Sequence, residues 1–147
     1  MTTNRREFFK RSAAAGALAT VPYVFAKAEK VIPKEDGKQT VAAIGVGGSR
    51  GAFSQGGAVA MRASALGRMI AVCDVDVVHC AEFNSKFDNQ LAMYGDYRKM
   101  LEREQPHIVT IGTPDHWHVP IAIAALHAGC DVYCEKPLTL TINEGKR

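Results

Sequence analysis

The sequence predicts an α/β fold in which helices cover a doubly wound parallel sheet. From Thr40 onward, short apolar runs alternate with segments of helical periodicity, which is the pattern of strand–helix–strand units. A glycine-rich turn follows the first apolar run, and an aspartate ends the second. The chain has 147 residues, which suffice for one domain with a hydrophobic core. No repeat or low-complexity tract interrupts the alternation.

Four apolar runs are predicted strands. Each is too short for a typical helix, and turn-forming or charged residues bound it. The runs are 40–47, which enters the glycine turn, 69–74, 107–113 and 131–135.

Four predicted helices follow or connect these runs, and each carries a start or stop signal. A carboxylate before the first turn accepts a free backbone N–H, proline suits the first turn, and glycine ends a helix. The signals are Gly67 after 58–66, Asp76 before a helix whose Cys80, Phe83 and Phe87 share one face, Asp96 before a short helix with Tyr97, Met100 and Leu101, and Pro120 and Gly129 at the ends of another.

Residues 1–28 are predicted to be a twin-arginine signal peptide. The segment NRREFFKR carries the Arg5-Arg6 pair and resembles the twin-arginine pattern. An alanine-rich stretch too short to span a bilayer follows, and an A-x-A cleavage site ends at Ala28. The alternative is a basic first helix of a cytosolic protein. We therefore expect export to the periplasm, with 29–39 as a solvated linker and no membrane span in the mature chain.

Charge and cysteine usage exclude several classes of protein. The formal charge of +3 comes from the basic N-terminal segment, so the remainder has no footprint for nucleic acid or an anionic membrane. His116 and His118 stand two residues apart, but no acidic or thiol partner lies nearby at ligand spacing, so we expect no metal site. The four cysteines, in strand and helix patterns or beside a turn, are predicted to be free and mostly buried.

The glycine turn after the first strand favours dinucleotide binding. Gly45 can form the tight bend, and Gly47 lets the backbone approach a pyrophosphate. A third glycine in strict register is missing, so either Gly48 shares the work or the turn is one residue longer and uses Gly51. A plain tight turn is the alternative for such a motif taken alone.

Asp74 ends the second strand, twenty-nine residues after Gly45. A carboxylate there can accept hydrogen bonds from an adenosine ribose and repel a 2′-phosphate, so we expect NAD to be preferred over NADP. The alternative is a helix cap, but Asp76 fits that role better.

Two further motifs follow predicted strands at the edge where open α/β sheets bind ligands. GTPDHWH, residues 112–118, predicts a cofactor-facing loop or a packed histidine, with Trp117 as a lid or a core residue. In the second motif, Pro137 keeps Lys136 extended at the mouth of its strand. The Lys136 ammonium could then hydrogen-bond a substrate oxygen and stabilise alkoxide character during hydride transfer. The alternative is a strand-end lysine paired with Glu135 or with solvent.

Together, AIGVGG, AVCDVD, TPDHWH, AGCDVY and EKPLTLT resemble the N-terminal domain of the Gfo/Idh/MocA oxidoreductases, which are NAD(P)-dependent sugar and cyclitol dehydrogenases and reductases. The resemblance covers 40–147 and implies a Rossmann fold with a bound NAD. It implies that the cofactor contacts Gly45, Gly47 and Gly48 at the pyrophosphate, Asp74 at the ribose, Thr113, Pro114 and His118 at the nicotinamide side, and Glu135 and Lys136 beside the substrate, with Lys136 catalytic.

The resemblance also implies that the parent protein continues beyond residue 147. Family members add a last parallel strand and an α+β domain that supplies the substrate pocket, an acid/base residue and an oligomer interface. We therefore expect a truncated sheet, an inactive chain and a homo-oligomeric parent that transfers hydride between NAD and a sugar or cyclitol hydroxyl. The alternatives are a cofactor-binding fragment without catalysis and the corresponding half of an NAD-dependent glycosidase.

Overall fold

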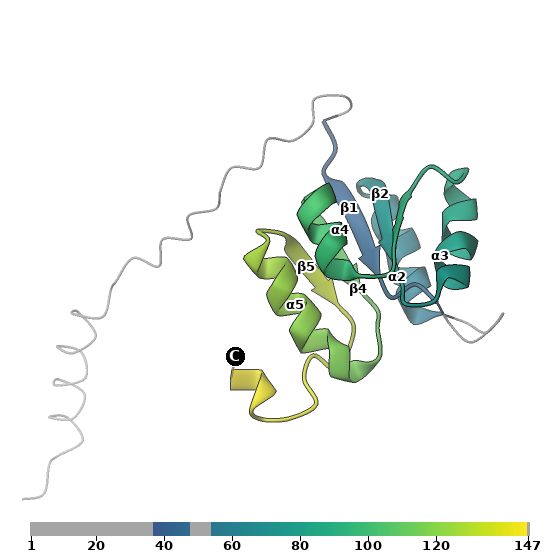
Figure 1. Cartoon of the computed structure of the whole chain (residues 1–147). Helices are drawn as coiled ribbons and strands as arrows, with labels where there is room; N and C mark the ends of the chain where they lie inside the picture. Colours follow the sequence, from purple (N-terminus) through teal and green to yellow (C-terminus); the bar gives the residue numbers. More distant parts are fainter. Residues whose placement is uncertain (1–36, 48–53, 147) are drawn as a thin grey trace, which may run out of the picture.

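The computed structural model describes residues 37–47 and 54–146, which form a parallel sheet between two helical layers (Figure 1). This is the predicted α/β Rossmann-like fold. The proposed signal peptide, most of the linker at 29–39, and Gly48 and Gly51 lie outside the described residues. The bounds and order of the helices and strands determine which residues lie at the carboxyl edge of the sheet.

The sheet has five strands in the order β3-β2-β1-β4-β5, and every pair is parallel. The four predicted strands are present with bounds that differ by at most a few residues. β3 was not predicted, because its three residues are too few for a periodic pattern. The strands are β1 (Thr40–Ile44), β2 (Arg68–Cys73), β3 (Ala92–Tyr94), β4 (Ile108–Ile111) and β5 (Asp131–Cys134).

Side-chain caps begin three of the four α-helices that the described residues form. Asp76 Oδ1 accepts from the N–H of Val78 at 2.8 Å, and Asp96 Oδ1 accepts from that of Arg98 at 2.9 Å, as predicted. Ser54 caps the first helix, so that helix begins three residues earlier than expected. The helices are α2 (Gln55–Ser64), α3 (Val77–Asn84), α4 (Tyr97–Glu104) and α5 (His118–His127), with short 3-10 turns η1 (Ser85–Phe87), η2 (Asp115–Trp117) and η3 (Glu144–Lys146).

Two apolar layers hold the helices to the sheet. Alternate strand residues point to opposite faces, so Ile44 and Val109 face α4 and α5, while Val41 and Val72 face α2 and α3. Figure 1 shows these helix pairs on opposite sides of the strands. Burial on both faces explains why the strand sequences are nearly continuous apolar runs rather than alternating ones.

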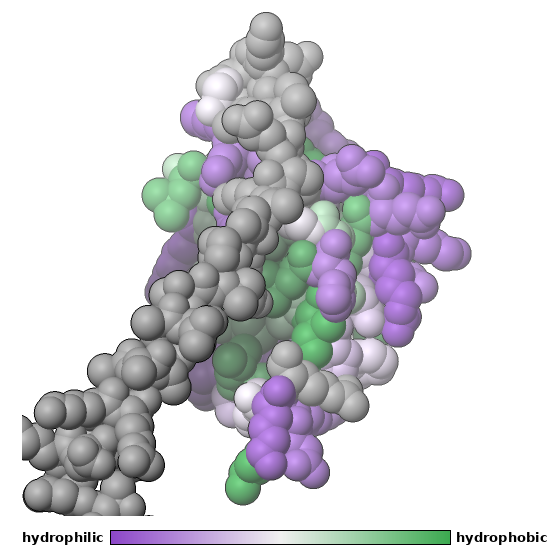
Figure 2. All heavy atoms as spheres, turned by 90° about the vertical axis from the view of Figure 1, so that its left-hand side faces the viewer, coloured by the Kyte–Doolittle hydropathy of each residue, from purple (hydrophilic) through white to green (hydrophobic). Residues whose placement is uncertain are grey.

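β5 is an edge strand of the sheet that the described residues form. Beside it, Leu126 and Leu138 are exposed, and Tyr133 of β5 itself is also exposed. Figure 2 views the molecule from this side and shows apolar side chains at the centre of the surface. Within residues 37–47 and 54–146, no helix is both long and apolar enough to cross a membrane.

Candidate functional site

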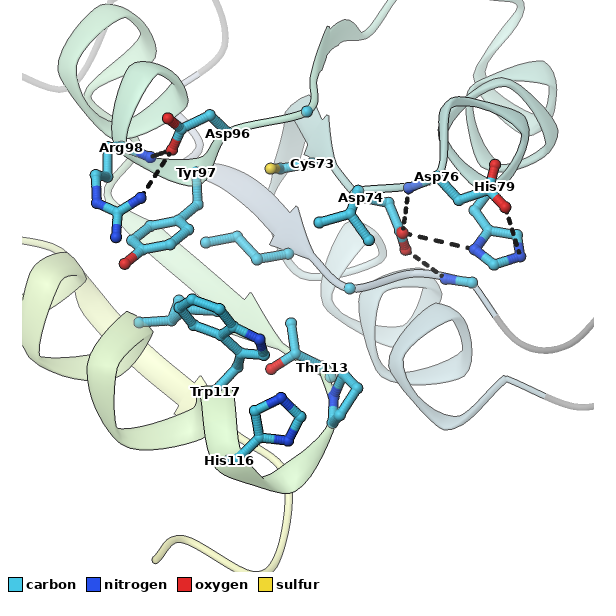
Figure 3. A pocket seen from close by; sticks show the side chains of 18 residues that line it. Cys73, Asp74, Asp76, His79, Asp96, Tyr97, Arg98, Thr113, His116 and Trp117 are labelled. Atoms are coloured by element: carbon cyan, nitrogen blue, oxygen red, sulfur yellow. Dashed lines mark hydrogen bonds and ion pairs between the residues drawn. The ribbon is translucent and has the colours of Figure 1, made fainter. Parts of the chain in front are cut away.

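A cavity of about 780 Å³ opens at the carboxyl edge of the sheet (Figure 3). Its walls come from the ends of β1, β2 and β4 and from the start of α4. The chain leaves β1 for β2 on one side of the sheet, and β4 pairs on the other side, so the strand order reverses at β1. Such a switch point leaves a crevice between diverging loops, where open α/β sheets bind ligands.

Three glycines bring the backbones of β1, α2 and β4 into contact beneath this cavity. Gly45 has φ +76°, and a Cβ there would lie 2.6 Å from the Thr113 nitrogen. A Cβ on Gly56 would lie 2.0 Å from the Gly45 oxygen, and one on Gly112 would lie 2.2 Å from the Gly56 Cα. Only glycine permits these approaches.

Gly56 therefore provides the close helix–strand packing that the third glycine of a dinucleotide-binding turn provides. We expected a third glycine at Gly48 or Gly51, which lie outside the described residues, and did not single out Gly56, which lies in the first turn of α2. The Ser54 cap followed by a glycine pair was the signal that could have identified it.

Asp74 lines the cavity, and its carboxylate accepts hydrogen bonds from the backbone of the glycine turn. Oδ2 accepts from the N–H groups of Val46 at 3.1 Å and Gly47 at 3.0 Å, and Oδ1 accepts from the Asp76 N–H at 3.0 Å. The alternative of a helix cap does not apply, because Asp76 caps α3. Asp74 therefore presents a negative charge that main-chain donors hold in place.

His79 also contributes to this wall, and sequence reasoning missed it. Its Nδ1 lies 3.5 Å from Asp74 Oδ1 (Figure 3). Its ring fills the space where a side chain on residue 47 would project, since a Cβ on Gly47 would lie 1.8 Å from Nδ1. The one sequence signal for this contact was that His79 lies in the first turn of the predicted helix, five residues after Asp74.

An aromatic pair forms the opposite wall. Tyr97 at the start of α4 and Trp117 in η2 pack edge to face, with ring centroids 6.5 Å apart. The Arg98 guanidinium lies 4.6 Å from the centroid of the Tyr97 ring. Trp117 is 42% exposed and lines the cavity, so it is not a core residue. Figure 3 shows both rings bordering the opening.

Thr113 and Pro114 line the cavity beyond the end of β4. The Thr113 hydroxyl is buried and has no hydrogen-bond partner among the described residues. A buried polar atom without a partner costs free energy, so this hydroxyl is suited to a polar atom of a ligand.

His118 does not line this cavity, although the resemblance implies a cofactor contact. Its side chain is 1% exposed, with Nδ1 2.7 Å from the Pro137 oxygen and Nε2 2.8 Å from the Thr113 oxygen. Both ring nitrogens are thus engaged by main-chain oxygens of the protein. This burial argues against direct contact with a cofactor.

Glu135 and Lys136 follow β5 and lie apart from the cavity walls. Glu135 Oε1 accepts from Gln55 Nε2 at 3.2 Å, and no ion pair joins Glu135 to Lys136 among the described residues. The exposed Lys136 matches the other half of the alternative, a strand-end lysine in solvent. Lys136 is exposed and lines a separate hollow with Leu126 and Leu138. The structure therefore does not bring the Lys136 side chain together with Asp74 or Thr113.

The four cysteines are free, and three of them are buried, as predicted. Cys73 lies at the base of the cavity, where burial above all, and then the nearby Cys80 and Asp74, raise the pKa of its thiol to about 12. A thiol that stays protonated is neither a nucleophile nor a metal ligand at neutral pH. The described residues contain no cluster of His, Cys, Asp and Glu that could hold a metal ion.

These features fit a dinucleotide. Glycine backbone at the end of β1, a held carboxylate at the end of β2 and an unpaired hydroxyl beyond β4 meet at one crevice. Residues 39–147 also match the model of a family described as an oxidoreductase family with an NAD-binding Rossmann fold. The chain belongs to the Gfo/Idh/MocA oxidoreductase family.

Curated relatives of this Gfo/Idh/MocA domain include several enzymes named for polyol substrates. The chain is 37% identical over 79 residues to levoglucosan dehydrogenase from Pseudarthrobacter phenanthrenivorans, which is 54% of the chain and 20% of the relative. It is 30% identical over 79 residues to inositol 2-dehydrogenase from Salmonella typhimurium, which is 54% of the chain and 24% of that enzyme. It is also 41% identical over 78 residues to a glycosyl hydrolase family 109 protein from Shewanella sp., covering 50% of the chain and 16% of that protein. The chain thus aligns with about a fifth of the length of these proteins.

Solved structures similar to this chain include proteins of the same kind. The chain is similar to myo-inositol 2-dehydrogenase from Lactobacillus plantarum, with a TM-score of 0.59 and 26% identity over 74% of this chain and 31% of that one. It is similar to GenD2 from gentamicin A biosynthesis in complex with NAD, with a TM-score of 0.63 and 26% identity over 74% of this chain and 30% of that one. The described residues are therefore an NAD-binding Rossmann domain.

Proposed function

We propose that this chain is the cofactor-binding part of an NAD-dependent oxidoreductase that acts on a sugar or cyclitol hydroxyl. The observation that carries the proposal is the crevice at the end of β1, where glycine backbone and the held carboxylate of Asp74 meet. The printed names of the relatives, which include levoglucosan, glucoside and inositol dehydrogenases, support the substrate class.

Each half of the cofactor has residues suited to hold it. Gly45 and Gly47 offer backbone at the pyrophosphate, and Asp74 offers its carboxylate to an adenosine ribose. Thr113 and Pro114 border the nicotinamide side, where the Thr113 hydroxyl can pair with a polar group. The bound cofactor supplies the hydride acceptor or donor.

Asp74 should select NAD over NADP. Its two oxygens already receive three main-chain N–H groups, which hold the negative charge where it would face a 2′-phosphate. Repulsion in a partly solvated site is worth a few kcal/mol at most, so a preference of about ten- to a hundredfold is expected.

Lys136 is proposed to act on the substrate. Its ammonium is solvent-exposed on a flexible four-carbon stem, so it can turn from its hollow toward a bound hydroxyl. There it would donate a hydrogen bond and stabilise alkoxide character. Lys136→Ala in the full-length parent should lower kcat more than it raises KM, and an unchanged kcat would contradict this role.

Cofactor titration of the 147-residue chain tests the binding proposal. Trp117 is the only tryptophan in the sequence and lines the cavity, so its fluorescence should change as NAD binds. We expect NAD to bind about ten- to a hundredfold more tightly than NADP, and Asp74→Ala to reduce that ratio. Absence of NAD binding would overturn the proposal, and equal affinities in the unsubstituted chain would remove Asp74 as the selector.

A second candidate is the cofactor-binding part of an NAD-dependent glycosidase. The 41% identity to a glycosyl hydrolase family 109 protein favours it. The full-length parent can be assayed with aryl glycosides and with free polyols. Release of the aglycone without net NADH would identify a glycosidase, whereas NADH formed in proportion to polyol would identify a dehydrogenase.

The N-terminal segment is proposed to direct export through the twin-arginine route to the periplasm. The Arg5-Arg6 pair and the A-x-A site ending at Ala28 support this proposal. Replacement of both arginines by lysine should retain the protein in the cytoplasm. Equal periplasmic amounts of the two forms, measured by cell fractionation, would contradict it.

A further inference from the structure

His118 joins the two loops that follow β4 and β5. It is the first residue of α5, and its side chain is 1% exposed. Nε2 lies 2.8 Å from the oxygen of Thr113, five residues before it, and Nδ1 lies 2.7 Å from the oxygen of Pro137, nineteen residues after it. One ring therefore contacts the main chain of both motifs that the sequence singled out at this edge.

The two ring nitrogens face two carbonyl oxygens, and the ring can donate to one or both of them. Imidazole can donate from both nitrogens when both carry a proton, and a neutral ring donates to one of the two. Because the ring is buried, water does not compete for these oxygens at its position. An apolar side chain of similar size would fill the space but would donate to neither oxygen.

The two contacts act on residues proposed to face the cofactor and the substrate. The Thr113 carbonyl belongs to the residue whose hydroxyl has no protein partner and whose neighbour Pro114 lines the cavity. The Pro137 carbonyl follows Lys136 directly. A shift of either carbonyl would displace these groups together.

We propose that His118 is a positioning residue that sets the nicotinamide end of the site by holding the main chain of Thr113 and Pro137. It does so without touching the cofactor. This inference rests on the proposed function. It separates the nicotinamide end from the adenosine end, where Asp74 holds the turn through its own hydrogen bonds.

The test compares two ligands, NAD and ADP-ribose, which share the adenosine and diphosphate but differ in the nicotinamide. Dissociation constants are measured by calorimetry with the full 147-residue chain. For His118→Leu, we expect the ratio of the NAD constant to the ADP-ribose constant to rise about tenfold. ADP-ribose binding itself should stay within about twofold of the unsubstituted chain.

Two conservative variants divide the contacts. The amide nitrogen of asparagine can occupy the place of Nδ1 and keep the Pro137 contact, whereas that of glutamine can occupy the place of Nε2 and keep the Thr113 contact. Because Thr113 lines the cavity, His118→Gln should preserve the ligand ratio better than His118→Asn. These variants also decide the matter if His118→Leu does not fold.

His107→Leu is the matched control. His107 directly precedes β4, at the amino end of the strands and away from the cavity. Its Nδ1 is 2.6 Å from the Thr40 hydroxyl oxygen. Its loss should lower thermal stability but leave the ligand ratio unchanged.

The outcomes separate the two proposals. If the unsubstituted chain binds neither ligand, the proposed function fails, and the positioning role fails with it. If the chain binds both, but every His118 variant keeps the ratio or weakens the two ligands equally, only the positioning role is overturned. A ratio that moves with His118 and not with His107 supports it.

Discussion

The ends of β1 and β2 differ from the ends of β4 and β5 in how their polar groups are held. At β1 and β2, the Asp74 carboxylate receives the N–H groups of Val46, Gly47 and Asp76. At β4 and β5, the Thr113 hydroxyl has no partner among the described residues, and Lys136 is exposed. The first region is held by hydrogen bonds from the turn after β1 to Asp74 after β2, and the second is joined by one buried histidine ring.

This difference suits a ligand with a constant half and a reacting half. Under the proposed function, hydrogen bonds already formed at Asp74 would reduce the ordering cost of binding at the adenosine end. Under the same proposal, the unpaired Thr113 hydroxyl and the exposed Lys136 would leave donors free for the groups that change during the reaction. The two regions share one rigid base, the glycine contact among β1, α2 and β4.

Gly56→Ala should give the largest effect, because it breaks this shared base. The new methyl group would lie 2.0 Å from the Gly45 oxygen and 2.9 Å from the Gly112 oxygen, and neither backbone can move without disturbing its strand. We expect the free energy of unfolding to fall by about 3 kcal/mol. Urea unfolding measures the change.

Gly95→Ala is the matched control, since a Cβ there would have no atom within 4 Å. It should change stability by less than about 0.5 kcal/mol. Equal stabilities of the two variants would mean that the backbones are not in the contact described.

Asp74→Asn sharpens the comparison at the β2 end. The amide removes the negative charge that receives three N–H groups, and it turns a donor toward one of them. We expect a loss of about 2 kcal/mol in the free energy of unfolding, because hydrogen bonds to charged groups are stronger than neutral ones. Asp76→Asn makes the same chemical change two residues away, where asparagine is also a good helix cap, and should cost about 0.5 kcal/mol or less. A similar loss in both variants would show that Asp74 has no special task.

The cysteines of β2 and β5 allow the two regions to be compared at alkaline pH. The expected change in the free energy of unfolding is smaller than for the variants above. Burial raises the pKa of Cys73 in β2 from 9.0 to about 12, so the unfolded chain loses this proton before the folded chain does. The stability that the Cys73 thiol contributes is therefore fully present below pH 9. It falls as pH rises toward 12, by at most about 1.4 kcal/mol per pH unit. Cys73→Ala should reduce this slope, measured by urea unfolding from pH 8 to 11, and leave the smaller loss from Cys80, whose pKa burial also raises.

Cys134→Ala in β5 serves as the control, because Cys134 is only half-buried. It should leave most of the alkaline loss in place. If Cys73→Ala and the unsubstituted chain showed the same pH profile, the Cys73 thiol would not be protected in the fold.

Much of this architecture was predictable because local patterns and tertiary structure agree. The caps at Asp76 and Asp96 were visible in the sequence, since a capping carboxylate acts within three residues. The start of α2 was misplaced, because Gly56 has low helix propensity and enters the helix for a contact with Gly45 and Gly112. A contact of that kind cannot be inferred from local propensity.

The site was predictable in position more than in detail. Asp74 and Thr113 were identified because each follows a strand, and parallel strands bring their carboxyl ends to one edge. The contacts of His118 span nineteen residues to Pro137, and those of His79 depend on how α3 packs behind β2. Such relations depend on the packed structure and have no periodic signature.

The central place of β1 has a consequence for how the chain folds. Its pairing with β2 joins Val41 to Met69, whereas its pairing with β4 joins Val41 to Ile108 across a much longer loop. Closing the longer loop costs more chain entropy, so the β1–β2 unit should form first and β4 should dock later. During synthesis, the crevice thus lacks its β4 wall until residues near 111 have left the ribosome.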